Sequence, residues 1–285
     1  MAARRSQRCS RVGGLHLQFG DDAASEAVVS WHTVEPVNSP RVVIGTPDDG
    51  LGTIVAAGTV TYRDAASGTD VRVHHARLTG LTPDTDYVYA AIHDGVRPEL
   101  GTLRTAPRGR APVRFTSFGD QSTPTLDAMV AKAYGSDNLG SPSAGDITSA
   151  AERVAPLFHL VNGDLCYANL SHDRVRTWSD WFENNSRSAR YRPWMPAAGN
   201  HENELGNGPI GYGAYHAYFG VPDAGHRDTS RRPRPGRCSE AATILAASSL
   251  STSTRGNPAA TRPWPPCTTR STDPSERRRR STSSR

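Results

Sequence analysis

The hydrophobic pattern of the chain changes its period once, at a short segment from Thr105 to Pro112 that holds two prolines and a glycine. Before this segment, apolar and polar residues alternate in short runs separated by Gly, Pro and Asp, which is typical of strands in an all-β domain. After it, short apolar runs alternate with stretches of helical period, which is typical of an α/β layer. Because 285 residues suffice for about two domains, we predict two domains joined by this linker.

Residues 13–107 are predicted to form a β-sandwich of about seven strands. The segment from Leu81 to Tyr87 has the form of a tyrosine corner, in which the Tyr87 hydroxyl bonds back to the main chain a few residues upstream. Trp31 lies in an alternating run, so we expect it in the core. This segment resembles a fibronectin type III-like module.

Residues 113–223 are predicted to form an α/β layer. The expected strands are 113–118, 157–161 and 193–198, and the expected helices are 126–134 and 173–188, the latter with Val175, Trp178, Trp181 and Phe182 on one side. Ser149 and Glu152 fit a capping box that opens a further helix, which Pro156 would close.

The two ends of the chain differ from its middle in charge. Residues 12–224 hold 16 basic and 24 acidic residues, although the whole chain has a formal net charge of +5. The basicity therefore lies in residues 1–12 and in the Arg/Ser/Thr/Pro-rich residues 224–285, both of which we predict to be disordered. We therefore expect no nucleic-acid partner. No apolar run reaches about 18 residues, so we expect no membrane partner either.

Three polar clusters follow the three predicted strands. They are Gly119-Asp120, Gly163-Asp164-x-x-Tyr167 and Gly199-Asn200-His201-Glu202. In open α/β sheets, ligands bind at the carboxyl ends of the strands. Carboxylate, amide and phenol oxygens suit hard cations, and a carboxylate such as Asp164 can bridge two of them. The clusters therefore predict a metal site for phosphoryl transfer.

This constellation, after a fibronectin-like module, resembles the purple acid phosphatases of the calcineurin-like metallophosphoesterase superfamily over residues 13–223. The resemblance implies a dinuclear centre of Fe(III) with Fe, Zn or Mn(II), which hydrolyses phosphate monoesters. It assigns Asp120 and Tyr167 to the ferric ion, Asp164 to both ions and Asn200 to the divalent ion. It makes His201 the catalytic proton donor to the leaving group. Glu202 is expected to orient the metal ligands without binding a metal itself.

The sequence departs from the family pattern at two places. Ser122 stands where the first motif, Asp-x-Gly, has its glycine. The two downstream histidine motifs of the family are absent, and only His216 and His226 follow Glu202. The ligand set is therefore incomplete, and the resemblance implies impaired activity. Because these motifs and the hydrophobic period are lost together near Ala224, we hypothesise that residues 224–285 are encoded out of frame.

Two other functions stay open at this point. One is a non-catalytic fibronectin-like binding module that carries a decayed phosphoesterase fragment. The other is a metal-dependent phosphodiesterase or nucleotide pyrophosphatase, since that chemistry uses the same machinery. The resemblance also implies a secreted or extracytoplasmic protein, although residues 1–12 show no signal peptide.

Overall fold

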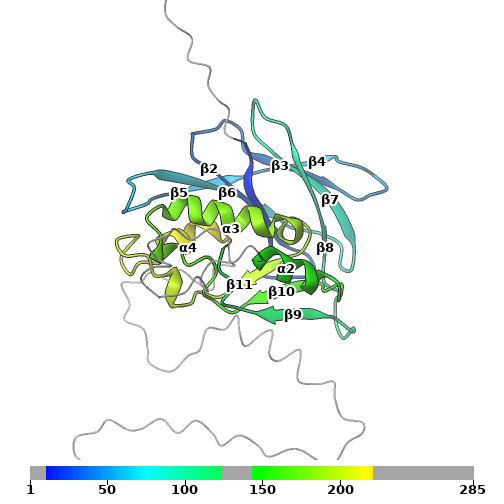
Figure 1. Ribbon diagram of the computed structural model, residues 1–285. Coiled ribbons are helices and arrows are strands. Elements are labelled where there is room, and N and C mark those ends of the chain that lie inside the picture. The colour runs from blue at the N-terminus through cyan, green and yellow to red at the C-terminus, as the bar shows by residue number, and fades with distance from the viewer. Residues whose placement is uncertain (1–10, 124–142, 221–285) are drawn as a thin grey trace, which may run out of the picture. The chain divides into compact units, whose positions relative to one another are not determined.

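The computed structural model describes residues 11–123 and 143–220 (Figure 1). The predicted helix 126–134 and the tail 224–285 lie outside these ranges. The sandwich and the α/β layer belong to one compact unit that ends at Asp223. None of the helices in the described ranges is long and apolar enough to cross a membrane.

The first part of the chain is a sandwich of two four-stranded antiparallel sheets. One sheet has the order β1-β2-β6-β5, formed by Gly13–Phe19, Ala27–Thr33, Asp70–Leu78 and Gly58–Arg63. The other has the order β4-β3-β7-β8, formed by Thr53–Ala56, Arg41–Gly45, Asp86–Ile92 and Glu99–Arg104. The predicted all-β sandwich is confirmed, with eight strands in place of about seven.

The sandwich core consists of the inward residues of the alternating runs. Trp31, Leu17 and Tyr89 are completely buried there. The tyrosine corner is present as predicted, because the Tyr87 hydroxyl accepts a 2.8 Å hydrogen bond from the backbone N–H of Thr82. This bond satisfies a main-chain donor beside the sandwich core.

The second part of the chain contains a three-stranded parallel sheet of order β11-β10-β9, formed by Trp194–Pro196, Phe158–Val161 and Phe115–Phe118. The α-helices are α2 (Ala144–Glu152), α3 (Arg174–Ala189) and α4 (Gly213–Tyr218), and the short 3-10 helices are η1 (Ala168–Leu170) and η2 (Asn200–Glu202). The predicted α/β layer is thus confirmed for the described residues.

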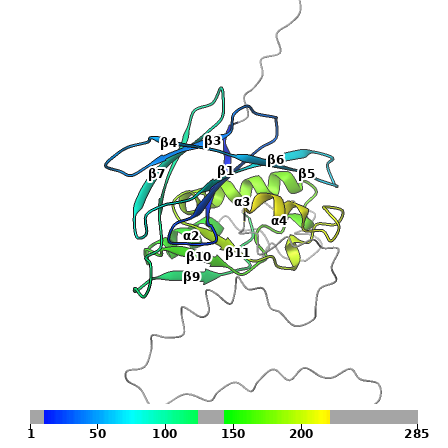
Figure 2. The ribbon, with the colours of Figure 1, turned by 180° about the vertical axis from the view of Figure 1, so that it is seen from behind.

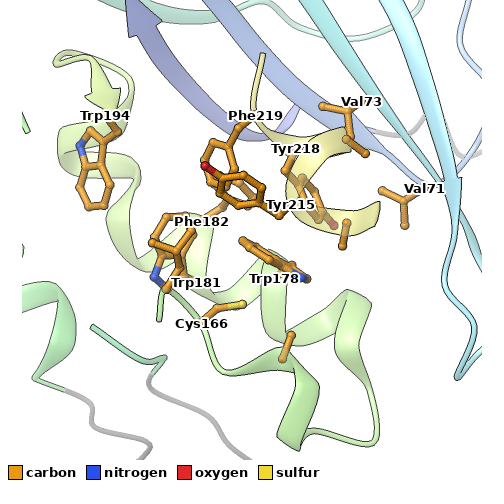
Figure 3. Close-up of a cluster of buried hydrophobic side chains, with 14 of the residues drawn as sticks. Val71, Val73, Cys166, Trp178, Trp181, Phe182, Trp194, Tyr215, Tyr218 and Phe219 are labelled. Carbon is orange, nitrogen blue, oxygen red and sulfur yellow. The ribbon is translucent and has the colours of Figure 1, made fainter. Parts of the chain in front are cut away.

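Helix α3 joins the sandwich to this layer. Its N-cap is Asp173, whose side chain accepts a hydrogen bond from the backbone N–H of Arg176. Its apolar face buries Trp178, Trp181 and Phe182 in one cluster with Val71 and Val73 of β6 (Figure 3). Figure 2 shows α3 and α4 between the sandwich strands and the parallel sheet. The two parts therefore share a hydrophobic core.

The capping box predicted at Ser149 is wrong. Helix α2 already begins at Ala144, so Ser149 lies inside it and donates its hydroxyl to the carbonyl oxygen of Gly145 at 2.9 Å. Glu152 instead accepts hydrogen bonds from His159 and Ser188. The local pattern failed because the Glu152 carboxylate is used by His159 of β10 and by Ser188 of α3 and not by the backbone of its own helix.

Candidate metal centre

The three polar clusters meet where the parallel strands end. The backbone N–H of Asp120, after β9, donates to the carbonyl oxygen of Gly163, after β10, at 3.1 Å. The N–H of Gln121 donates to the carbonyl oxygen of Asp164 at the same distance. Main-chain hydrogen bonds thus continue past the ends of the strands and hold the first two clusters side by side.

Glycine allows the second and third clusters to approach each other. A Cβ atom at Gly199 would lie 2.3 Å from Oδ1 of Asp164, and one at Gly163 would lie 2.7 Å from the Cα atom of Gly199. Gly163 also has a φ of 87°, which favours glycine. The glycines in the motifs are therefore required by the close contact of the two loops.

Three of the predicted metal ligands have left-handed backbone conformations. The φ angles are 50° at Asp120, 52° at Asp164 and 60° at Tyr167. Non-glycine residues rarely adopt this region, and each costs of the order of 1 kcal/mol or more. Strain concentrated at three neighbouring positions is typical of a functional site.

The side chains of the first two clusters are in contact. The Tyr167 hydroxyl donates a 3.2 Å hydrogen bond to Oδ1 of Asp120. Burial, and then the negative charge of Asp120, raise the pKa of Tyr167 above its ordinary value. A cation bound between the two oxygens would reverse this effect, because it stabilises the phenolate.

The third cluster closes on the second through His201. Its backbone N–H donates to Oδ1 of Asp164 at 2.9 Å. Its ring lies 4.2 Å from the ring of Tyr167, measured between centroids. Asp120, Asp164, Tyr167 and His201 are therefore brought together.

Solvent reaches several of these side chains. Asn200 is exposed at the start of η2, next to His201, and Asp120 is exposed as well. Asp164 and His201 are half-buried, whereas Tyr167 is buried. Three of the four predicted oxygen donors, Asp120, Asp164 and Asn200, are therefore at least partly exposed.

Glu202 links the second and third clusters from the buried side. Its carboxylate accepts three backbone hydrogen bonds, from Asp164 at 2.9 Å, Leu165 at 2.7 Å and Gly199 at 2.7 Å. Burial raises the pKa of Glu202, and the three N–H donors oppose that rise. The side chain touches none of the predicted ligand atoms, so it holds the loops in place.

Two residues in contact with the site were given no role from sequence. Asn169 accepts a hydrogen bond at its side-chain oxygen from Nδ1 of His201, 3.0 Å away. Gln121 donates to Thr148 of α2 and accepts from Trp181 of α3. Asn169 lies two residues after Tyr167, but neither Asn169 nor Gln121 carries a local pattern that reveals its partners.

Ser122, which stands at the glycine position of the Asp-x-Gly motif, has a backbone conformation that favours glycine. Its φ is 63°, in the left-handed region. Its hydroxyl is buried and has no hydrogen-bond partner within the described ranges. The substitution is therefore accommodated at a cost, without displacing Asp120 from Tyr167.

The donor types fit a hard cation only in part. Two carboxylates, a phenol and an amide supply oxygen, which suits a ferric or similar ion. Over residues 11–123 and 143–220, no three His, Cys, Asp or Glu side chains form a group that could hold a metal. Cys166 is fully buried, and burial raises the pKa of its thiol, so it offers no thiolate.

Comparisons with known proteins agree with this geometry. Residues 12–105 match the model of the purple acid phosphatase N-terminal domain. Uncharacterized proteins from two strains of Mycobacterium tuberculosis are 72% identical over 214 residues, which is 75% of this chain and 40% of theirs. A purple acid phosphatase of Glycine max is 28% identical over 228 residues, which is 76% of this chain and 44% of that protein.

The same relation appears among solved structures. A purple acid phosphatase from yellow lupin seeds superposes with a TM-score of 0.59 at 22% identity, over 75% of this chain and 41% of that one. The chain thus spans about two fifths of the length of the relatives that it matches. Residues 12–105 thus match a purple acid phosphatase N-terminal domain, the similar sequences include purple acid phosphatases, and the chain shares the fold of the lupin structure over the matched part.

Proposed function

We propose that the protein is a hydrolase of phosphate monoesters that works with a dinuclear metal centre at the ends of β9, β10 and β11. The observation that carries this proposal is the contact of the Tyr167 hydroxyl with the Asp120 carboxylate, beside an Asp164 that faces the next loop. A relative from Arabidopsis thaliana has the name Fe(3+)-Zn(2+) purple acid phosphatase. That name supports the proposed pair of ions.

The proposed ligand assignment is the one that the family resemblance implies, and the contacts support it. Asp120 and Tyr167 would hold the ferric ion, and Asp164 would bridge it to a divalent ion. Asn200 directly precedes His201, whose backbone N–H is bonded to Asp164, and we assign the Asn200 amide oxygen to the divalent ion. Two ions held in this way would polarise the phosphate ester and stabilise the charge that develops on its oxygens.

His201 is placed to handle the proton of the leaving group. Because the side-chain oxygen of Asn169 only accepts, Nδ1 of His201 carries a proton. The other ring nitrogen, Nε2, is then left for the substrate, and it donates a proton only when the ring is positively charged. A role as general acid therefore requires the ring with both nitrogens protonated.

We propose that the chain binds the two metal ions weakly. The printed sequence offers three ligands to the ferric ion and two to the divalent ion, and it lacks the histidine motifs that the family resemblance implies. Metal affinity depends on ligand number and geometry. We therefore expect the 285-residue chain to bind iron detectably and to hydrolyse phosphate esters poorly.

Ferric titration of the purified chain tests the site. A visible charge-transfer band from the Tyr167 phenolate is expected, with loss of the band in Tyr167→Phe and its retention in Tyr191→Phe, whose ring is exposed. Absence of the band in the wild-type chain would contradict the ligand assignment. Rapid hydrolysis of p-nitrophenyl phosphate with added iron and zinc would contradict the proposed impairment.

The alternative of an independent binding module is less well supported. The sandwich buries Val71 and Val73 in the same cluster as α3, so it is not a separate body. The phosphodiesterase alternative uses the same donors and is distinguished by comparing bis-p-nitrophenyl phosphate with p-nitrophenyl phosphate. An extracytoplasmic location and a phosphate monoester as substrate remain parts of the proposal.

A further inference from the structure

A buried carboxylate of the sandwich lies in contact with the loop that follows His201. Asp64 directly follows the last residue of strand β5, and its side chain is completely buried although it lies at the start of a turn. One of its oxygens, Oδ2, accepts hydrogen bonds from the backbone N–H and the hydroxyl of Ser67. These bonds shape the turn between β5 and β6. They leave Oδ1 directed at another part of the chain.

That other part is the loop around Asn207, whose side chain is saturated with hydrogen bonds. Its Nδ2 donates to Oδ1 of Asp64 at 3.2 Å and also to Glu204. Its Oδ1 accepts from the backbone N–H of Ala65 at 2.7 Å. An amide with every donor and acceptor used in a buried place fixes the distance between the two segments.

Glu204 connects this contact to the site. Its Oε1 accepts a 2.6 Å hydrogen bond from the indole N–H of Trp178 in α3, and its other oxygen accepts from Asn207. Glu204 is completely buried and lies two residues after Glu202, whose carboxylate holds the loops of Asp164 and Gly199. Glu202 therefore contacts the loops of Asp164 and Gly199, whereas Glu204, two residues later, contacts α3 and Asn207, which in turn contacts Asp64.

The packing between the two segments is close. A Cβ atom at Gly206 would lie 2.7 Å from the Cβ atom of Ala65. At the far end of the same segment, Nε2 of His75 lies 3.0 Å from the carbonyl oxygen of Ala217 and donates to it. The sandwich thus fastens the stretch after His201 near both of its ends.

We propose that Asp64 is a positioning residue for the Asn200–His201 turn, acting through Asn207 and Glu204. The sandwich would then set the position of the Asn200–His201 turn in the site. The consequence for catalysis rests on the function proposed above, whereas the coupling between Asp64 and the turn does not depend on metal or substrate.

The test compares Asp64→Asn with Asp70→Asn in the full chain. Both carboxylates belong to the same hairpin and both form an ion pair, Asp64 with the largely buried Arg174 at 3.7 Å and Asp70 with the exposed Arg63 at 3.1 Å. In Asp64→Asn, one carboxylate oxygen becomes an N–H₂ group. This group cannot accept the hydrogen bonds that Asn207 or Ser67 donates to Asp64 in the wild type. Hydrogen exchange is measured at the amides of Gly199 and His201, which are bonded to Glu202 and Asp164.

In Asp64→Asn we expect exchange at these two amides to accelerate by about tenfold, and in Asp70→Asn to stay within about twofold of the wild type. The ¹⁵N resonances of the His201 ring, assigned by their loss in His201→Gln, should shift in the first variant only. If only the turn around Ser67 exchanges faster, Asp64 is a turn residue and the proposal is overturned.

Asn207→Ser is the second variant, because it keeps the main-chain bonds of the loop and shortens only the side-chain link. It should accelerate hydrogen exchange at the same two amides and shift the same ¹⁵N resonances of the His201 ring. Unchanged signals in either folded variant contradict the proposal. Failure of the iron titration with the coupling intact would instead contradict only the proposed function.

Discussion

The backbone N–H of His201 donates a 2.9 Å hydrogen bond to the carboxylate of Asp164. This one contact joins the loop after β11 to the loop after β10, and it orients Asp164 toward the site. It exists because Gly199, two residues earlier, carries no side chain that would collide with Asp164. The site is therefore built from loop contacts as much as from its ligands.

Replacing Glu202 by glutamine should destabilise the protein by about 2 kcal/mol, because the amide N–H₂ cannot accept the backbone hydrogen bonds that the carboxylate accepts. Urea unfolding followed by tryptophan fluorescence measures the effect. Glu183→Gln, in which the exposed ion pair with Arg11 is lost, should change stability by less than about 0.5 kcal/mol. Equal effects of the two substitutions would show that Glu202 does not hold the loops.

Replacing Ser122 by glycine should stabilise the protein by about 0.5 to 1 kcal/mol. The gain comes from relief of the left-handed φ of 63° and from removal of a buried hydroxyl. Ser122→Ala separates the two causes, since alanine removes the hydroxyl and keeps the backbone strain. A glycine variant no more stable than the alanine variant in urea would mean that the backbone is not strained at this position.

Stability should fall as the pH is lowered from 6.5 towards 4, because of buried histidines in the sandwich. Burial lowers the pKa of His16 to about 4, that of His32 to about 3 and that of His74 to about 4. In this window the unfolded chain binds protons that the folded chain does not, so the free energy of unfolding decreases with falling pH. Each such group contributes up to about 1.4 kcal/mol per pH unit.

Glu204 acts in the opposite direction. Burial raises its pKa to about 7, so its contribution to stability is present at low pH and is lost as the pH rises through that value. The three histidines together lower the free energy of unfolding more than Glu204 raises it as the pH falls. The urea midpoint should therefore still decrease from pH 6.5 to 5. His32→Phe should flatten this decrease, whereas His172→Gln, at an exposed position, should not. A midpoint independent of pH would contradict the burial of these rings.

Replacing Asn169 by alanine should change the tautomer of His201. In the wild type the amide oxygen of Asn169 holds the proton on Nδ1. Without that acceptor the neutral ring is free to carry its proton on Nε2. The ¹⁵N chemical shifts of the ring report the change directly. Asn169→Asp, which keeps an acceptor at the same place, should retain the Nδ1 proton, and identical spectra of the alanine variant and the wild type would exclude this role.

Much of the fold and of the site could be predicted from local patterns. The sandwich follows from period-two alternation, the tyrosine corner from the spacing that ends at Tyr87, and α3 from the helical period of Trp178, Trp181 and Phe182. The strand-end position of Asp120 and Asp164 follows from the rule that parallel strands end at one edge of a sheet.

Contacts between distant segments required the tertiary structure. The start of α2 was missed because Glu152 contacts His159 and Ser188 and caps no helix. The burial of Asp64 against Asn207 joins residues 143 positions apart, and nothing in the local sequence of either residue indicates the other.

The amino-acid sequence by itself determined the two kinds of architecture, the order of the strands along the chain and the residue types that face the site. Only the tertiary structure decided which loops touch, which carboxylates are buried and which nitrogen of His201 is bonded to Asn169. The physical reason is that periodicity is set by each residue and its near neighbours, whereas burial and hydrogen-bond partners are set by segments that meet only after the chain has folded.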